Sequence, residues 1–271
     1  MISSAKMHKA EGVLRRLLPF RECVQTIIGN LLSSDAPVSS PLTATRPETR
    51  RVAVIVLGSD DGLCGAYNVN IFKNTLTTLS EIREQFGTKT PIDIMPVGKK
   101  MTRAVKRIAE TDPYLTLVAP ENVDSKSEGQ PVKEFAADIE EAFLTGKYDR
   151  VMLQYMHYHS AGRQRFASRV YLPISQEELS SKSKGTGRPY LFEPNAAEIF
   201  STVLPMYLLS QMQEAFAQNR ASEQAARVMA MQSANDNAQK LLEQLQLDYN
   251  KLRQQSITTE LLDIVGGQKR D

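Results

Sequence analysis

A long stretch without helix breakers dominates the C-terminal part of this 271-residue chain. After Pro205 no glycine or proline occurs until Gly266, so residues 206–265 are 60 consecutive helix-permissive positions. At 1.5 Å per residue they could form a rod of roughly 90 Å. The stretch holds ten Gln, eight Ala and only twelve charged residues. Small and uncharged side chains suit close approach by another helix, so we interpret the stretch as one half of a coiled coil.

The N-terminal segment is the candidate partner. In residues 1–34 the large aliphatic side chains recur mostly three or four positions apart, from Leu14 to Leu32, which predicts a helix. Such a helix would be roughly 50 Å long and therefore shorter than the C-terminal one. The far part of the C-terminal helix is then expected to be bare or covered by another protein.

Between these segments the sequence alternates strand and helix patterns. Residues 50–175 begin with the β-branched run RVAVIVLG and end with the hairpin-like pair RVMLQYMHYH and RFASRVYLPI. Alternation at this spacing predicts a small α/β sandwich with a mainly parallel sheet. The expected strands are 51–58, 91–97, 115–119, 150–159 and 165–174, and the expected helices are 68–87, 98–110 and 132–146.

Composition shifts divide the chain further. Residues 33–49 contain three prolines and four serines, which is typical of a linker. We therefore expect an N-terminal coiled-coil helix (1–34), a linker (35–49), the α/β domain (50–175), a loop or foot segment (176–195) and the C-terminal coiled-coil helix (196–271). Pro205 could mark a kink or a late start of that last helix.

The overall composition excludes several classes of protein. A net charge of +2 gives no argument for nucleic-acid binding. The two cysteines, Cys23 and Cys64, are too few for a disulfide framework and are typical of a cytosolic protein. No apolar run approaches the roughly 20 residues that span a bilayer, so direct membrane insertion is not expected. The N-terminus lacks the apolar region of a secretory signal.

The loop SDDGLCG at 59–65 has the layout of a phosphate cradle, because it follows a strand and precedes a helix. Its glycines do not have the G-x-G-x-x-G spacing of a dinucleotide site, and no Lys-Ser or Lys-Thr follows them as in a P-loop. Asp60 and Asp61 would repel a phosphate and instead favour a turn. We interpret the loop as a strand-to-helix turn without a nucleotide.

Other candidate sites are weaker still. VGKK at 97–100 lacks the upstream glycine and the following Ser or Thr of a P-loop. His157 and His159 share one strand face, but no third metal ligand has suitable spacing. Cys64 at a helix start could be activated, although packing behind the strand explains it more simply. No cofactor, metal or catalytic residue is therefore predicted.

Several long motifs, in order, carry a resemblance to a known family. They are SSAKMHKAE, SDDGLCGAYN, YLPI, PYLFEP, SEQAARVMAM, SANDNA and YNKLRQQSITTELLDIVGG. With these motifs the chain resembles the gamma subunit of F-type ATP synthases, the central rotor shaft. The resemblance covers most of the chain and is weakest over 88–150. It implies an α/β fold plus a long antiparallel coiled coil, with a Rossmann-like domain, free of nucleotide, inserted between the terminal helices.

The resemblance also assigns contacts to individual residues. Arg253, Gln254 and Thr258 match family residues that touch the hexamer of alpha and beta subunits. Arg227 matches a position near the lever region of the catalytic subunits. Glu193 and Tyr190, in PYLFEP, match the segment that contacts the membrane ring (c-ring). This segment belongs to the foot, which sits on the ring and binds the epsilon subunit. All six are interaction residues and none is catalytic.

By this resemblance the protein is a non-catalytic central-stalk rotor, which couples proton-driven ring rotation to conformational cycling of the hexamer for ATP synthesis or hydrolysis. Its expected location is peripheral, on the cytoplasmic face of the bacterial inner membrane. One departure is that Met1 stands where family members are already in mid-helix, so the first turns are expected to be missing. An α/β nucleotide-binding enzyme and an unrelated coiled-coil scaffold are the alternatives.

Overall fold

The computed structural model describes residues 2–33, 39–175, 179 and 191–267. These residues fall into two compact units, Met1–Val228 and Met229–Asp271. The first unit contains the sheet, the N-terminal helix and the first part of the C-terminal helix. The N-terminal helix and the start of the C-terminal helix therefore share one compact unit with the α/β domain.

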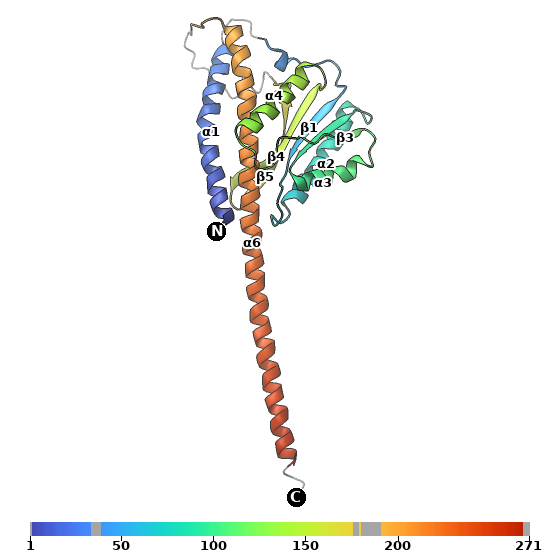
Figure 1. Cartoon of the computed structure of the whole chain (residues 1–271), viewed down its shortest axis with the longest axis vertical. Coiled ribbons are helices and arrows are strands. Elements are labelled where there is room, and N and C mark those ends of the chain that lie inside the picture. Colours follow the sequence, from blue (N-terminus) through green and yellow to red (C-terminus); the bar gives the residue numbers. More distant parts are fainter. Residues whose placement is uncertain (1, 34–38, 176–178, 180–190, 268–271) are drawn as a thin grey trace. The chain divides into compact units, whose positions relative to one another are not determined.

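A five-stranded sheet forms the centre of the first unit (Figure 1). Its strands lie in the order β3-β2-β1-β4-β5, and all neighbours are parallel except β4 and β5, which pair antiparallel. The predicted mainly parallel sheet and its terminal hairpin are thereby confirmed. The strands are β1 (Val52–Leu57), β2 (Ile92–Val97), β3 (Leu115–Leu117), β4 (Arg150–Ser160) and β5 (Arg163–Leu172).

The two faces of the sheet are covered by different helices. Successive side chains of β1 point to opposite faces: Val52, Val54 and Val56 pack with α2 and α3, while Ala53 and Ile55 pack with α4 and the terminal helices. Burial on both faces explains why β1 is an unbroken β-branched and aliphatic run. The three helices are α2 (Tyr67–Phe86), α3 (Lys99–Ala109) and α4 (Gln130–Leu144).

Two terminal helices, α1 (Ile2–Leu32) and α6 (Ala196–Gly267), pair antiparallel within the first unit (Figure 1). Ala10 near the start of α1 clusters with Ala217 and Ala221 of α6. Near the end of α1, Leu31 joins the core cluster of Leu204. Small side chains at 217 and 221 allow the two backbones to approach closely, as the alanine content of this stretch predicted.

Two proline-containing segments differ from expectation. Pro205 lies inside α6, which already begins at Ala196, so it does not mark a late start of the helix. In the segment predicted as a linker, Pro41–Thr43 form a short 3-10 helix and Leu42 is buried in the core. Arg46 then forms an ion pair of 2.6 Å with Asp149. The described part of this segment is therefore anchored to the α/β domain.

The second unit consists of the C-terminal part of α6, which is helical to Gly267. Every residue from 231 to 265 is exposed. Its large apolar side chains share this exposure and recur along the helix from Met231 to Val265. Whether this part is bare or covered by another protein in a complex stays a prediction, and in this chain residues 231–265 are exposed. Among the described residues no helix is long and apolar enough to cross a membrane.

Candidate functional site: the junction between the SDDGLCG loop and helix α6

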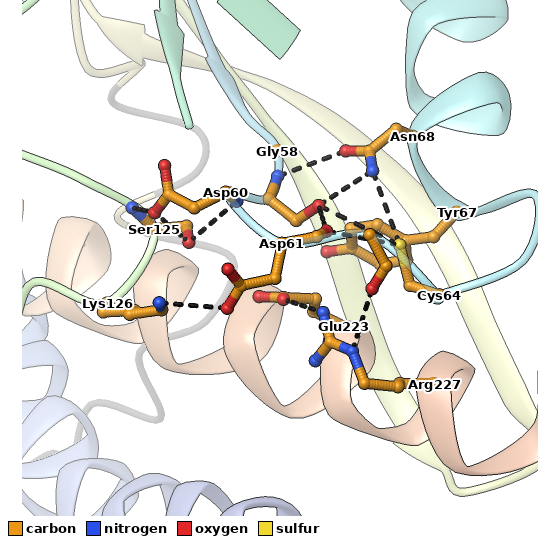
Figure 2. Close-up of polar contacts among 12 residues, drawn as sticks. Gly58, Asp60, Asp61, Cys64, Tyr67, Asn68, Ser125, Lys126, Glu223 and Arg227 are labelled. Carbon is orange, nitrogen blue, oxygen red and sulfur yellow. Dashed lines mark hydrogen bonds and ion pairs between the residues drawn. The ribbon is translucent and has the colours of Figure 1, made fainter. Parts of the chain in front are cut away.

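The SDDGLCG loop (residues 59–65) leaves the carboxyl end of β1 and is held tightly against the sheet edge (Figure 2). The backbone N–H of Ser59 donates to Asn68 Oδ1 at 3.1 Å, and Asn68 Nδ2 donates back to Ser59 Oγ at 2.8 Å. On the neighbouring strand end, Gly98 has φ +104°, and a Cβ there would lie 2.9 Å from Ser59 backbone atoms. Only glycine fits this close approach of the two loops.

Asp60 lies at the N-terminus of α3, and a helix N-terminus is a kind of site at which a phosphate can bind. Its Oδ1 accepts the backbone N–H of Lys99 at 3.0 Å, at the start of α3, and its Oδ2 accepts the N–H and the hydroxyl of Ser125 at 3.1 and 2.6 Å. Burial raises the pKa of Asp60, but the hydrogen bonds from Ser125 and Lys99 outweigh it, so the pKa lies below its ordinary value. At this helix start, the Lys99 N–H and both Ser125 donors are thus occupied by a side chain of the protein itself.

Asp61 binds the loop that follows β3, at the same carboxyl end of the sheet. Its carboxylate forms an ion pair of 2.9 Å with Lys126, in the β3–α4 connection, and this contact lowers the pKa of Asp61. The same connection reaches α6, because Arg220 donates to the carbonyl of Lys126 at 3.3 Å and pairs with Glu128. Three loops that follow three strands are therefore tied together and to the helix.

Asn219 of α6 is the centre of the contacts between the helix and the sheet. Its side chain is buried, and its Nδ2 donates to the carbonyl of Gly58 at 2.9 Å. Its Oδ1 accepts from the hydroxyl of Tyr67 at 2.6 Å and from the backbone N–H of Met156 at 3.4 Å. One amide thereby joins the end of β1, the start of α2 and the middle of β4. Ser222, one turn further, donates to the Met156 carbonyl at 2.9 Å.

Arg227 closes the junction at the end of the buried part of α6 (Figure 2). Its Nε donates to the carbonyl of Gly62 at 3.1 Å, and its other contact is an ion pair of 2.6 Å with Glu223, one turn earlier. The side chain of Arg227 is only 11% exposed and that of Glu223 only 2%. Burial raises the pKa of Glu223, while Arg227 lowers it in part. The pair fixes both the loop backbone and the helix surface.

The junction is therefore a set of polar contacts that join the sheet to α6, and their effect is mechanical. The free thiol of Cys64 in the loop is buried, and among the described residues no group of three or more acidic, histidine or cysteine side chains could hold a metal ion. What the arrangement can do is fix the α/β domain against residues 219–227 of α6. Such a fixture suits a protein that transmits force or orientation through a helix.

Comparison with known proteins agrees with this interpretation. A family model described as ATP synthase matches residues 1–269. The chain is 40% identical to the ATP synthase gamma chain of Bacteroides thetaiotaomicron, over 98% of this chain and 91% of that one, and 40% identical to its counterpart in Bacteroides fragilis, over 98% and 90%. The chain belongs to the ATP synthase gamma-chain family.

Chains in solved structures of ATP synthases have a similar fold. A chain from the Euglena gracilis mitochondrial ATP synthase, in a cryo-EM structure of OSCP, F1 and c-ring, matches with a TM-score of 0.54 and 22% identity over 99% of this chain and 93% of that one. A chain of the Tetrahymena thermophila central stalk and c-ring structure matches with a TM-score of 0.50 and 20% identity, over 87% of this chain and all of that one. These likenesses support the fold of this gamma-family chain, an α/β domain with long terminal helices.

The predicted interaction residues of the gamma-family chain fall in separate places. Arg227 belongs to the junction, where it is mostly buried. Arg253, Gln254 and Thr258 are exposed in the second unit, and the Thr258 hydroxyl donates to the Gln254 carbonyl at 2.8 Å. Glu193 is exposed before α6, and Tyr190 lies outside the described residues. The structure brings Gln254 and Thr258 onto adjacent turns, and their contacts with partners stay predictions.

Sequence reasoning missed most of the junction. Asn219, Glu223 and Tyr67 were not singled out, and Asp60 was considered only as a turn former that would repel a phosphate. The missed signal was a change along α6: a run of small and polar residues, ASEQAAR, follows the aliphatic part of the helix. Cys64 is buried, as the prediction that it packs behind the strand required. His157 is half-buried near Glu214.

Proposed function

We propose that this chain is the central-stalk rotor subunit of an F-type ATP synthase. Family membership supports this role, and the observation that carries it is the change in character of α6. From Tyr207 to Arg227 its residues are all buried or half-buried, whereas from 231 to 265 all are exposed. One part of the helix is thus fixed to a folded domain, and another is open to partners.

The proposed mechanism is mechanical and needs no catalytic residue in this chain. An asymmetric helix inside a threefold ring of alpha and beta subunits presents a different face to each catalytic subunit, and so biases identical sites into different conformations. Rotation driven by proton flow through the ring then moves each site through its states, which links the two processes as a coupling free energy. The six Gln residues between 231 and 265 suit this role, because exposed uncharged side chains form no strong ion pair that would hold one angle.

We assign the contacts with the hexamer to Arg253, Gln254 and Thr258, which are exposed and available. For Arg227 we propose a contribution through the loop that it holds, because its guanidinium already binds Glu223 and the Gly62 carbonyl. Glu193, with Tyr190, is assigned to the foot that meets the c-ring and the epsilon subunit. The proposed location is the cytoplasmic face of the bacterial inner membrane, as a peripheral subunit.

Reconstitution tests this function. The full chain is added to the alpha/beta hexamer of the same organism, with the epsilon subunit, and complex formation and ATPase rate are measured. We expect a stable complex and a stimulated rate. The chain alone should not hydrolyse ATP; hydrolysis by the pure chain, or failure to join the hexamer, would contradict the proposal.

A matched pair of variants tests the contact residues. R253A/Q254A/T258A removes the proposed contacts, and K251A/Q255A/T259A removes the same kinds of exposed side chain from adjacent positions of the same helix. If three contacts contribute about 0.5 kcal/mol each, the first variant should bind or stimulate the hexamer roughly tenfold less well. The second should stay within about twofold of the unmodified chain. Equal effects of both variants would refute the assignment.

A further inference from the structure

Helix α3 carries a strip of positive charge that neither the junction nor the proposed contacts use. All five of its basic residues are exposed: Lys99, Lys100, Arg103, Lys106 and Arg107. At 3.6 residues per turn these positions cover an arc of about 120° and a length of about 12 Å. The exposed acidic residue Glu110 lies at the end of the strip. The strip is therefore narrow and carries five cations along one helix.

The spacing of these cations along α3 makes them repel one another. Lys99, Lys100, Lys106 and Arg107 all lie three or four positions from Arg103, the spacing at which like charges on a helix repel. Lys99 and Lys100 also stand at the N-terminal turn, where the helix dipole disfavours positive charge. Within the described part of the chain none of the five forms an ion pair. A partner outside this chain would offset that repulsion.

The surroundings of the strip restrict what the partner can be. The apolar side of α3 is fully used inside the domain, where Met101 and Val105 are completely buried. No apolar face of α3 is thus left to enter a bilayer, as a helix lying on a membrane requires. Asp60 and Asp124 line a cavity of about 360 Å³ beside Lys99 and Arg103, so negative charge borders the strip on that side. A broad anionic surface would meet these carboxylates as well as the cations.

We propose that the basic strip of α3 is a docking surface for a carboxylate-rich helix or loop of a neighbouring subunit. A segment one helix wide, with acidic side chains three or four residues apart, matches the arc and length of the strip and avoids Asp60 and Asp124. The strip lies on the opposite face of the sheet from α1 and α4 (Figure 1). The strip would therefore make a contact in addition to those proposed for the rotor. The choice of complex for the test below rests on that proposed rotor function.

Charge neutralisation in the assembled complex is the first test. The variant R103Q/K106Q/R107Q removes three charges from the strip, and K73Q/K89Q/K133Q removes three from exposed positions on other elements. Dissociation constants from the hexamer with its epsilon subunit are measured at about 50 mM and 300 mM salt. We expect the strip variant to bind about tenfold more weakly at low salt, with most of the difference lost at high salt because exposed charges are then screened. The control should stay within about twofold at both.

Carbodiimide cross-linking is the second test, because this reagent joins a lysine amine directly to a carboxylate in contact with it. Lys99, Lys100 or Lys106 should form a cross-link to an acidic residue of another subunit, identified by peptide mapping. A complex that forms normally but shows no such cross-link, or a strip variant that behaves like the control, would overturn the inference while leaving the rotor function intact. Loss of binding to vesicles with about 30% phosphatidylglycerol, without any change in assembly, would overturn it in favour of a membrane.

Discussion

Replacement of Asn219 by alanine should loosen the attachment of the α/β domain to α6. The substitution removes the donor to the Gly58 carbonyl and the acceptor for the Met156 N–H, and both groups lie in the buried junction. A buried group left without its partner costs about 1–3 kcal/mol. The Tyr67 hydroxyl retains one acceptor, the Asn219 backbone carbonyl at 2.9 Å, so its loss is smaller. We therefore expect the free energy of unfolding to fall by about 2–4 kcal/mol.

Urea unfolding followed by near-ultraviolet circular dichroism of the tyrosines measures this change, since the chain has nine tyrosines and no tryptophan. With an m value of about 3 kcal/mol per molar urea, the midpoint should fall by about 1 M. N70A is the matched control, because Asn70 is exposed on α2 in the same unit. It should change the free energy by no more than about 0.5 kcal/mol.

A double-mutant cycle with Y67F separates the direct contact from general damage. The hydroxyl of Tyr67 and the amide of Asn219 touch at 2.6 Å, so the double variant should be less destabilised than the sum of the single ones, by about 0.5–1 kcal/mol. The reasoning is refuted if N219A unfolds within 0.5 kcal/mol of the unmodified chain, if N70A is equally damaging, or if the two substitutions add without coupling.

Three further substitutions probe the charges and the backbone around the same fold. R227M leaves Glu223 buried without its ion-pair partner and should lower the free energy of unfolding by about 2–4 kcal/mol; R227M/E223L should recover at least half of this in the same urea assay. Burial raises the pKa of Glu140 from 4.5 to about 7, so between these pH values the folded chain keeps a proton that the unfolded chain releases. The free energy of unfolding should therefore fall as pH rises through this range. E140Q should remove this pH dependence and add about 1–2 kcal/mol at pH 8, as measured by urea unfolding across pH. G98A places a Cβ 2.9 Å from backbone atoms at φ +104° and should cost more than about 2 kcal/mol in thermal unfolding, whereas G62A, whose nearest neighbour would be 3.9 Å away, should be almost neutral.

The sequence was sufficient to predict the elements of the α/β domain because their patterns are local. The β-branched run that became β1 and the helix ended by Gly87 are each specified within a few residues, and their bounds differ from the predicted ones by only one or two positions. The pairing of α1 with α6 was predicted from apolar and small residues, whereas its antiparallel direction was implied only by the family resemblance. Such features depend on periodicity, which a single sequence shows directly.

The junction could not be predicted, because its contacts join residues from about 40 to 165 positions apart. Asn219 and Glu223 lie in a helix where polar residues are common, and nothing local distinguishes a buried polar side chain from an exposed one. Asp60 was recognised as hostile to phosphate, but its own partners, Lys99 and Ser125, come from two other loops. Only the order of the strands, which places three strand ends side by side, brings these groups together.

Helix α6 uses uncharged polar residues in two physically different ways. At Asn219 and Ser222 the side chains are buried and hydrogen-bonded to the sheet, and breaking such contacts is costly because no water replaces the lost partner. At Gln254 and Thr258 the side chains are exposed, where exchange between water and a partner changes the free energy little. Rigid attachment needs the first kind of contact and repeated sliding past a partner needs the second. A rotor requires both, and this chain supplies them in consecutive parts of one helix sequence.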